Sequence, residues 1–233
     1  MEALKNLMTD WEVIKFSFFN WDSLKQIHPL LLQGWWMTIK LCVAVVPLGF
    51  TLGACIATLY SFRFRPVNWI LIGFVDFFRS IPPLVLLIYT VYGLPLLGWD
   101  VPAFGAVLVA FTLNSSSYYG EIIRAGIESI PKGQMEAARS TGLNRLQAMY
   151  YVVLPQSLRN VAPDLTSNTL ELIKATSIAS VVALPELLRM GRVAQGLVYN
   201  ATPLIAAAVI YLIMLWPMVR LLSRLERQMM STR

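Results

Sequence analysis

Oppositely charged residues interrupt the most apolar stretches of the chain. Three pairs share a spacing of three residues: Asp76 with Arg79, Glu121 with Arg124, and Glu171 with Lys174. That spacing places both members on one face of a helix, where they can neutralise each other. Ionised groups are costly in lipid, so each pair is a candidate for a solute pathway or a gate. A structural brace between helices is the alternative for every pair.

Groups that could catalyse a reaction or bind a metal are scarce. The chain has one histidine, His28, and no G-x-x-x-x-G-K-[ST] loop that could bind nucleotide phosphates. Cys42 and Cys55 lie 13 residues apart in one expected helix, about 20 Å and too far for a disulfide. We therefore expect no enzyme, no metal site and no cofactor bound by this chain.

The composition predicts an integral membrane protein. Of its 233 residues, 57% are hydrophobic and 14% charged, whereas soluble domains average about 25% charged residues. A membrane-spanning helix needs roughly 20 apolar residues. Five stretches qualify, at about 34–60, 67–91, 102–123, 162–184 and 203–222. The sequence thus predicts an all-α fold with five transmembrane helices.

The basic residues indicate how these helices are oriented. Three regions carry most of the lysine and arginine: the connection after the first stretch (Arg63, Arg65), the connection after the third (Arg124, Lys132, Arg139, Arg145, Arg159) and the tail (Arg220, Arg224, Arg227, Arg233). Basic loops stay in the cytoplasm, so the N-terminus is expected outside and the C-terminus inside. This distribution accounts for the net charge of +6 without nucleic acid.

The same pattern divides the chain into three parts. Residues 1–33 are expected to lie along the outer membrane surface, since aromatic residues alternate there with charges. Residues 34–223 form the transmembrane domain, which includes a cytoplasmic loop at about 125–160. Residues 224–233 form a cytoplasmic tail.

A double proline is expected to break the second stretch. Pro82 and Pro83 follow Arg79 closely, and proline removes a backbone donor and clashes with the preceding turn. Irregular backbone at membrane depth normally lines protein-filled or water-filled space. We therefore assign Asp76, Arg79 and Pro82 to a gate or to a structural pair.

The loop at 125–160 reads as short helices broken by turns. A helix is expected over 134–141, with Gly142 at its C-terminal end. Asn144 should cap a second helix over 145–153 that Pro155 stops. The first helix is expected to expose Ala137 and Ala138 beside Glu136, because small side chains let a helix lie close in a groove on another protein.

These residues resemble a known motif. Glu136-Ala137-Ala138, then Gly142, then Leu154-Pro155 is similar to the EAA motif of bacterial ABC importer permeases. Further segments resemble the polar amino acid uptake branch: Gly34-x3-Thr38, Phe78-Arg79-Ser80-x-Pro82, Tyr118 to Arg124, Lys174-x-Thr176-Ser177 and Pro185-Glu186-Leu187. The resemblance implies a permease of type I fold in the bacterial inner membrane.

The resemblance also implies partners and a mechanism. Two copies of a separate ATPase, which hold ATP and Mg, would dock on Glu136, Ala137, Ala138, Gly142 and Pro155 and drive alternating access. A second permease, the same or related, would pair with this chain, and an extracytoplasmic solute-binding protein would deliver the cargo. Candidates for the substrate pathway are Asn114, Tyr118, Glu121, Lys174, Thr176 and Ser177.

One departure from the family pattern concerns the substrate. Ala175 stands where the family element L-K-D-T-S-L has an aspartate. Loss of an acid favours an acidic, neutral or modified amino acid over a basic one, although the acid could instead lie on the partner permease. A passive channel or a secondary transporter remains the alternative function, and a membrane-embedded enzyme is a third.

Overall fold

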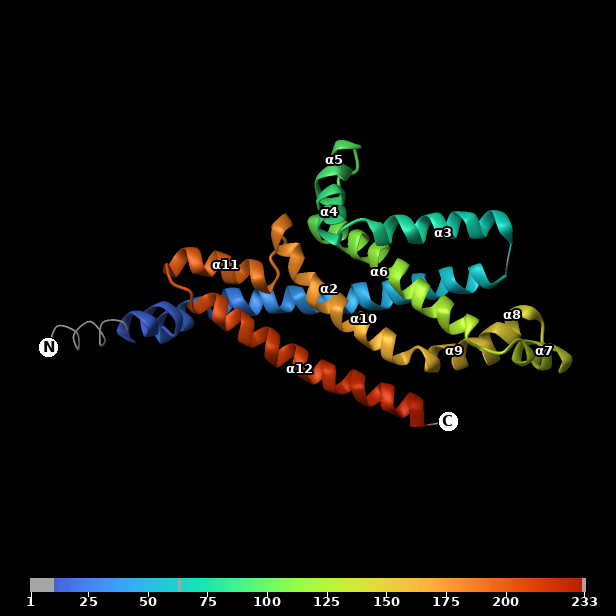
Figure 1. The fold of residues 1–233 in the computed structure, drawn as a ribbon. Helices are drawn as coiled ribbons and strands as arrows, with labels where there is room; N and C mark the ends of the chain where they lie inside the picture. The colour runs from blue at the N-terminus through green and yellow to red at the C-terminus, as the bar shows by residue number, and fades with distance from the viewer. Residues whose placement is uncertain (1–10, 63, 232–233) are drawn as a thin grey trace. The chain divides into compact units, whose positions relative to one another are not determined.

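The computed structural model describes residues 11–62 and 64–231. Residues 1–10 of the expected outer segment, Arg63 and residues 232–233 of the expected tail lie outside the described residues. All regular structure in the described ranges is helical, which confirms the all-α prediction (Figure 1).

After a short helix at 11–18, the helices follow in this order: α2 (Trp21–Ser61), α3 (Arg65–Ser80), α4 (Pro83–Ile88), the π-helix η1 (Tyr89–Gly93), α5 (Leu94–Leu96), α6 (Ala103–Glu128), α7 (Lys132–Ser140), α8 (Arg145–Ala148), the π-helix η2 (Met149–Val153), α9 (Leu154–Asn160), α10 (Ala162–Ala175), the 3-10 helix η3 (Thr176–Val182), α11 (Leu187–Val198) and α12 (Thr202–Ser231). The described residues form two compact units, one made of 11–41 with 177–218 and the other of 42–62 and 64–176 with 219–231.

The first unit packs the beginning of α2 against α11 and the beginning of α12. Its buried core contains Ile27, Leu31, Leu187, Ala194 and Ala207. Helix α2 starts where the Asn20 side chain accepts hydrogen bonds from the backbone N–H groups of residues 22 and 23, the usual role of an N-cap asparagine.

The second unit is built around α6, which packs against α3, α4, α9 and α10. Small residues bring α2 close to α6: a Cβ atom on Gly53 would lie 2.8 Å from the backbone nitrogen of Gly120 and 2.6 Å from Cβ of Tyr119. Glycines at such crossings let backbones approach closely, as they commonly do between helices in lipid.

The double proline breaks the second stretch, as expected. Helix α3 and the run Pro83–Leu96, which begins with α4, meet at an angle of 99°, and the bend can be followed in Figure 1. Because Pro82 has no N–H, the carbonyl of Phe78 loses its usual helical donor. The side-chain amide of Asn114 on α6 donates to that carbonyl at 2.9 Å. A residue from a neighbouring helix thus satisfies the acceptor that the proline leaves open.

Membrane-spanning length and apolarity are met by fewer helices than the five predicted. Among the described residues, the runs Trp11–Ser61 and Thr202–Arg224 qualify, and a third span results if the bent pair of α3 and Pro83–Leu96 counts as one. Helix α6 has the length, but Asn114 and Ser115–Ser117 lower its apolarity.

The fourth predicted stretch differs from a continuous helix. Helix α10 ends at Ala175 and the 3-10 helix η3 follows it. The hydroxyl of Thr176 donates to the carbonyl of Ile173 at 2.7 Å, and Ala183 adopts a positive φ of 60°. Helix α11 was not predicted, because the residues between the fourth and fifth apolar stretches were expected to form a loop.

Candidate functional site

The loop between α6 and α10 consists of short, well-capped helices. Gly142 has a φ of +92°, a conformation that glycine adopts without strain, and it ends the segment after α7. Asn144 begins α8 with a capping box, since its side chain accepts from the backbone of Gln147 and the Gln147 side chain accepts from the backbone of Asn144. Both positions behave as the sequence predicted.

Pro155 does not stop the helical run, contrary to the prediction. The chain widens into the π-helix η2 immediately before it, with Leu154 N donating to Met149 O, and α9 continues from there. A π-turn shifts the hydrogen-bond register by one residue. That shift relieves the clash that a proline ring would make with the turn before it. The π-helix η1 likewise directly precedes Leu94-Pro95.

The exposed face of α7 contains Glu136 and Ala137 but not Ala138. The first two side chains are exposed, whereas Ala138 is only 7% exposed, on a helix that packs against η2. The prediction that both alanines are exposed is therefore wrong for Ala138. The small side chain of Ala138 lets α7 pack closely against η2. The small side chain of Ala137 leaves the exposed face of α7 without a bulky side chain at that position.

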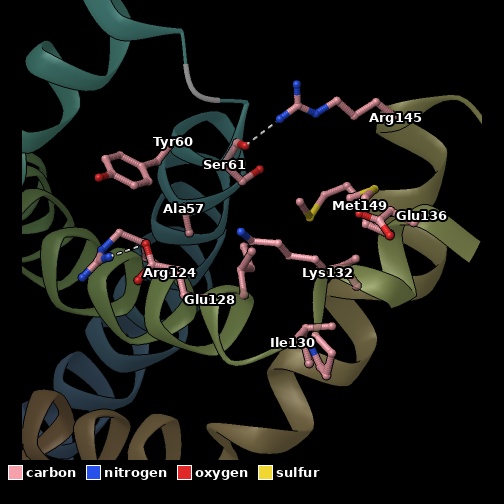
Figure 2. Close-up of a pocket in the computed structure, with 14 residues that line it drawn as sticks. Ala57, Tyr60, Ser61, Arg124, Glu128, Ile130, Lys132, Glu136, Arg145 and Met149 are labelled. Atoms are coloured by element: carbon pink, nitrogen blue, oxygen red, sulfur yellow. Dashed lines mark hydrogen bonds and ion pairs between the residues drawn. The ribbon is translucent and has the colours of Figure 1, made fainter. Parts of the chain in front are cut away.

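A hollow of about 390 Å³ lies between α7 and the ends of α2 and α6. Apolar side chains form much of its wall, including Ala57, Ile127, Ile130, Met135 and Met149. Charged side chains enter it from three helices: Arg124 and Glu128 from α6, Lys132 and Glu136 from α7, and Arg145 from α8 (Figure 2).

A chain of charges links α3 to the end of α6. Arg124 binds Glu121 through two nitrogens, at 3.0 and 2.7 Å, and binds Glu128 at 2.7 Å. The pair of Glu121 with Arg124 expected from the sequence is thus confirmed. Arg79 approaches Glu121 from α3 at 3.9 Å and lies over the ring of Tyr118, 5.5 Å from its centroid.

The expected pair of Asp76 with Arg79 does not form. Arg79 contacts Glu121 on α6 instead, and Asp76 takes part in none of the ion pairs found in the described part of the chain. The face of α3 that carries both residues lies against α6, where Glu121 competes for the guanidinium. Asp76, Glu121 and Arg124 line one cavity of about 240 Å³.

The other candidate pathway residues differ in their accessibility. Tyr118 is half-buried and Lys174 is exposed, whereas Thr176 and Asn114 are buried. Ser177 belongs to the first unit. The structure adds a polar contact that the sequence analysis missed, between the hydroxyls of Tyr119 and Thr169 at 2.7 Å. An i, i+50 separation leaves no sequence signal for such a pair.

Two motifs that are far apart in the sequence meet in the first unit. The backbone N–H of Leu187 donates to the Thr38 hydroxyl at 3.1 Å. A Cβ atom on Gly34 would lie 2.8 Å from Cα of Leu187. The glycine and threonine of Gly34-x3-Thr38 therefore seat the beginning of α11 on α2.

Glu186 is fully buried at the start of α11. Its carboxylate accepts from the backbone N–H groups of Leu188 and Arg189, at 2.9 and 2.6 Å, and from the Tyr211 hydroxyl at 2.6 Å. Burial raises the pKa of this carboxyl, and those three hydrogen bonds oppose the rise. Glu186 thus fixes α11 to α12, a role that the sequence analysis did not assign.

No group of three or more histidine, cysteine, aspartate or glutamate side chains within the described ranges is arranged to bind a metal ion. Arg79 on α3 and Arg124 on α6 both pair with Glu121.

Comparison with known proteins identifies the family. The model of the family described as "Binding-protein-dependent transport system inner membrane component" matches residues 46–231. The chain belongs to this family. Its relatives are permease subunits, so it is a transport component and not an enzyme.

Individual relatives extend over most of the chain. The arginine transport system permease protein ArtQ of Bacillus subtilis is 35% identical over 205 residues, which cover 87% of this chain and 94% of ArtQ. The glutamate/aspartate import permease protein GltK of Escherichia coli O6:H1 is 35% identical over 180 residues, 73% of this chain and 80% of GltK.

A solved structure described as an amino acid ABC transporter with histidines is similar with a TM-score of 0.79 and 35% identity, over 90% of this chain and 98% of that one. The MetNI methionine ABC transporter shares the fold, with a TM-score of 0.74 at 23% identity, over 88% and 98% of the two chains.

Proposed function

We propose that the chain is the permease subunit of an ATP-driven importer for amino acids or amino-acid-like compounds. The observation that carries this proposal is the family match over 46–231 together with the exposed Glu136-Ala137 face of α7. The relatives named for arginine, for glutamate and aspartate, and for glutamine support the amino acid class.

The membrane topology that we propose has five crossings, with residues 1–33 along the outer surface and residues 224–233 in the cytoplasm. Three crossings do not meet the length or apolarity of a typical membrane-spanning helix as single helices. We assign them to the bent pair of α3 and Pro83–Leu96, to the polar helix α6, and to α10 together with η3. Polar residues in α6 are compatible with lipid when they face other helices. The basic connections favour the cytoplasmic placement of the 125–160 loop.

The ATPase is proposed to dock on α7. Its two copies bind ATP and Mg, and this chain binds neither. Glu136 and Ala137 form the contact face, whereas buried Ala138 and the Gly142 turn hold α7 in place on the permease. Pro155, at the start of α9, keeps the π-turn that connects the loop to α10. Motion of α7 would thereby reach the membrane helices.

The gate is proposed to lie where α3 meets α6. Arg79 and Glu121 form the contact between these helices, and the break at Pro82 lets the segments on either side move separately. Asp76 shares the cavity with Glu121 and Arg124 and offers Arg124 an alternative partner. When the gate opens, Arg124 could pair with Asp76 in place of Glu121, so that its charge would stay paired within the membrane.

The substrate pathway is proposed to run past Tyr118, Lys174, Thr176 and Ser177, with Asn114 and Glu121 shaping its wall through the contacts they already make. Family membership leaves the substrate charge open, since relatives for arginine and for glutamate and aspartate are equally identical to this chain. Ala175, in place of an acid, favours an acidic, neutral or modified amino acid.

A second permease, the same or related, would complete the pathway, and an extracytoplasmic solute-binding protein would deliver the substrate. The test is purification of the chain from native membranes in mild detergent, with identification of bound proteins by mass spectrometry. An ATPase recovered near one-to-one with permease supports the proposal. Recovery of the chain with itself alone, while other membrane complexes survive, would favour a channel or secondary transporter.

A further inference from the structure

The hollow behind α7 contains two cations that have no carboxylate partner. Of its three basic residues, Arg124 is bound by Glu121 and Glu128. Lys132 and Arg145 take part in none of the ion pairs found among the described residues. Arg145 donates instead to the carbonyl of Ser61 at 3.1 Å.

The two free cations belong to one hollow but to different helices. The side chain of Lys132 points into the hollow from α7, and Arg145 reaches over it from α8 toward Ser61 (Figure 2). The lining contains three basic side chains, Arg124, Lys132 and Arg145, and two carboxylates, Glu128 and Glu136. The lining side chains therefore carry a net positive charge.

Aromatic residues occur at and next to the positions that line the hollow: Tyr60 is part of the lining, and the π-helix η2, which contributes Met149 and Val153, also carries Tyr150 and Tyr151. Arg145 lies over the ring of Phe62 at 5.4 Å, and Arg124 lies over the ring of Tyr60 at 5.5 Å. Tyr150 and Tyr151 are both exposed, at 65% and 66%, with ring centroids 5.2 Å apart. Exposed aromatic residues beside cations at the ends of apolar helices mark the headgroup layer of a membrane.

We propose that this hollow binds the headgroup of an anionic phospholipid, with the phosphate between Lys132 and Arg145. Basic pockets between helix ends on the cytoplasmic side of membrane proteins suit such headgroups. The apolar wall formed by Ala57, Ile127 and Met149 would accommodate the glycerol and the first acyl carbons. The bound lipid would hold α7 against the ends of α2 and α6, and so would stiffen the segment on which the ATPase is proposed to dock.

The proposal uses the family's membrane location and does not depend on which amino acid is carried. Its test is native mass spectrometry of the chain, purified with the subunits that remain bound and titrated with phosphatidylglycerol or phosphatidylcholine. The test variant combines Lys132→Gln with Arg145→Gln. The control combines Arg139→Gln with Arg159→Gln, which removes two charges at exposed positions outside the hollow.

The expected result is tight phosphatidylglycerol binding that weakens roughly 25-fold in the test variant, since each cation near an anionic surface contributes about fivefold. The control variant and the affinity for phosphatidylcholine should not change. Equal phosphatidylglycerol binding in the test and control variants would overturn the proposal. Equally effective competition by inorganic phosphate would also overturn it, because the hollow would then hold a free anion.

Single variants at Lys132, an exposed position, keep the test decisive if the double variant does not fold. Lys132→Arg should retain binding and Lys132→Glu should abolish the preference for phosphatidylglycerol. Unchanged lipid binding together with loss of the copurifying ATPase in Lys132→Glu would assign the hollow to the ATPase and would overturn the lipid proposal.

Discussion

Replacing Asn114 with leucine should destabilise the bend between α3 and α4. The Asn114 amide donates to the carbonyl of Phe78 at 2.9 Å, and Pro82 cannot supply the helical donor that this carbonyl would otherwise have. Leucine shares the branching of asparagine at Cγ, but it is larger and has no donor. The variant therefore leaves the backbone acceptor of Phe78 unpaired.

The size of the effect follows from the environment of the carbonyl. Interhelical hydrogen bonds in membrane proteins contribute about 0.6 kcal/mol on average. A buried acceptor that is left unpaired costs about 1–3 kcal/mol. Since Asn114 is only 7% exposed, water cannot readily replace the amide. We expect a loss of about 1–2 kcal/mol, or a Tm lower by about 2–8 °C for a chain of this size.

Thermal unfolding in detergent measures this change, with Ser116→Ala as the matched control. Ser116 is buried on the same helix, but its hydroxyl donates to the carbonyl of Leu113 one turn earlier and bridges no two helices. Spin labels at the exposed positions 69 and 92, on either side of the bend, should show a broader distance distribution in the Asn114→Leu variant. A Tm equal to that of Ser116→Ala, with an unchanged distribution, would refute the proposed role.

Four further outcomes are expected. Gly53→Ala should lower Tm by several degrees because its Cβ has no space against α6, whereas Gly73→Ala should not, since nothing lies within 4 Å of that position; equal effects would contradict the packing. The raised pKa of the Glu186 carboxyl means that its contribution to stability is present at low pH and is lost as pH rises from about 4.5 through the raised value. Wild-type Tm should therefore fall relative to Glu186→Gln over that range, and parallel curves would exclude the shift. Glu136→Lys should reduce both ATP-driven uptake and copurification of the ATPase, and normal values for both would remove α7 as the docking site. Ala175→Asp should favour cationic amino acids in vesicles supplied with the binding protein, and unchanged selectivity would end that argument.

Local features of the chain were predictable from the sequence because their causes are local. Gly142 needs a positive φ at a helix end, Asn144 and Gln147 sit at capping-box spacing, and Pro82 cannot continue a helix. Glu121 and Arg124 pair within one helix turn. In each case the residues that decide the geometry lie within about four positions of one another.

Contacts between distant segments could not be predicted in this way. The i, i+3 spacing of Asp76 and Arg79 allowed a pair, but Glu121 on α6 competes for Arg79, and no local pattern reports that competitor. The burial of Ala138 depends on where η2 lies. Pro155 lies in a continuous helical run only because the backbone widens into the π-helix η2 (Met149–Val153) just before it. The residue types at these positions did not indicate a π-helix.

The pathway and the number of membrane-spanning helices depend on contacts between helices that are far apart in the sequence. Helix α6 is an apolar stretch interrupted by serines, and its packing against α3, α9 and α10 explains how these polar residues can be buried. The sequence indicated Glu186 only as part of a family match, yet its carboxylate joins the start of α11 to Tyr211. That partner lies 25 residues away, beyond any periodic signal.

ATP-dependent uptake in proteoliposomes would show whether the chain works as the permease of an ATP-driven importer. The chain, its copurified ATPase and its binding protein would be reconstituted together, and accumulation of radiolabelled amino acids measured with ATP or a non-hydrolysable analogue inside. We predict concentrative uptake with ATP and none with the analogue. Replacing Glu136 with lysine should abolish the uptake that ATP drives. Uptake at the same rate with the analogue would contradict this prediction and would identify the chain as a channel or a secondary transporter.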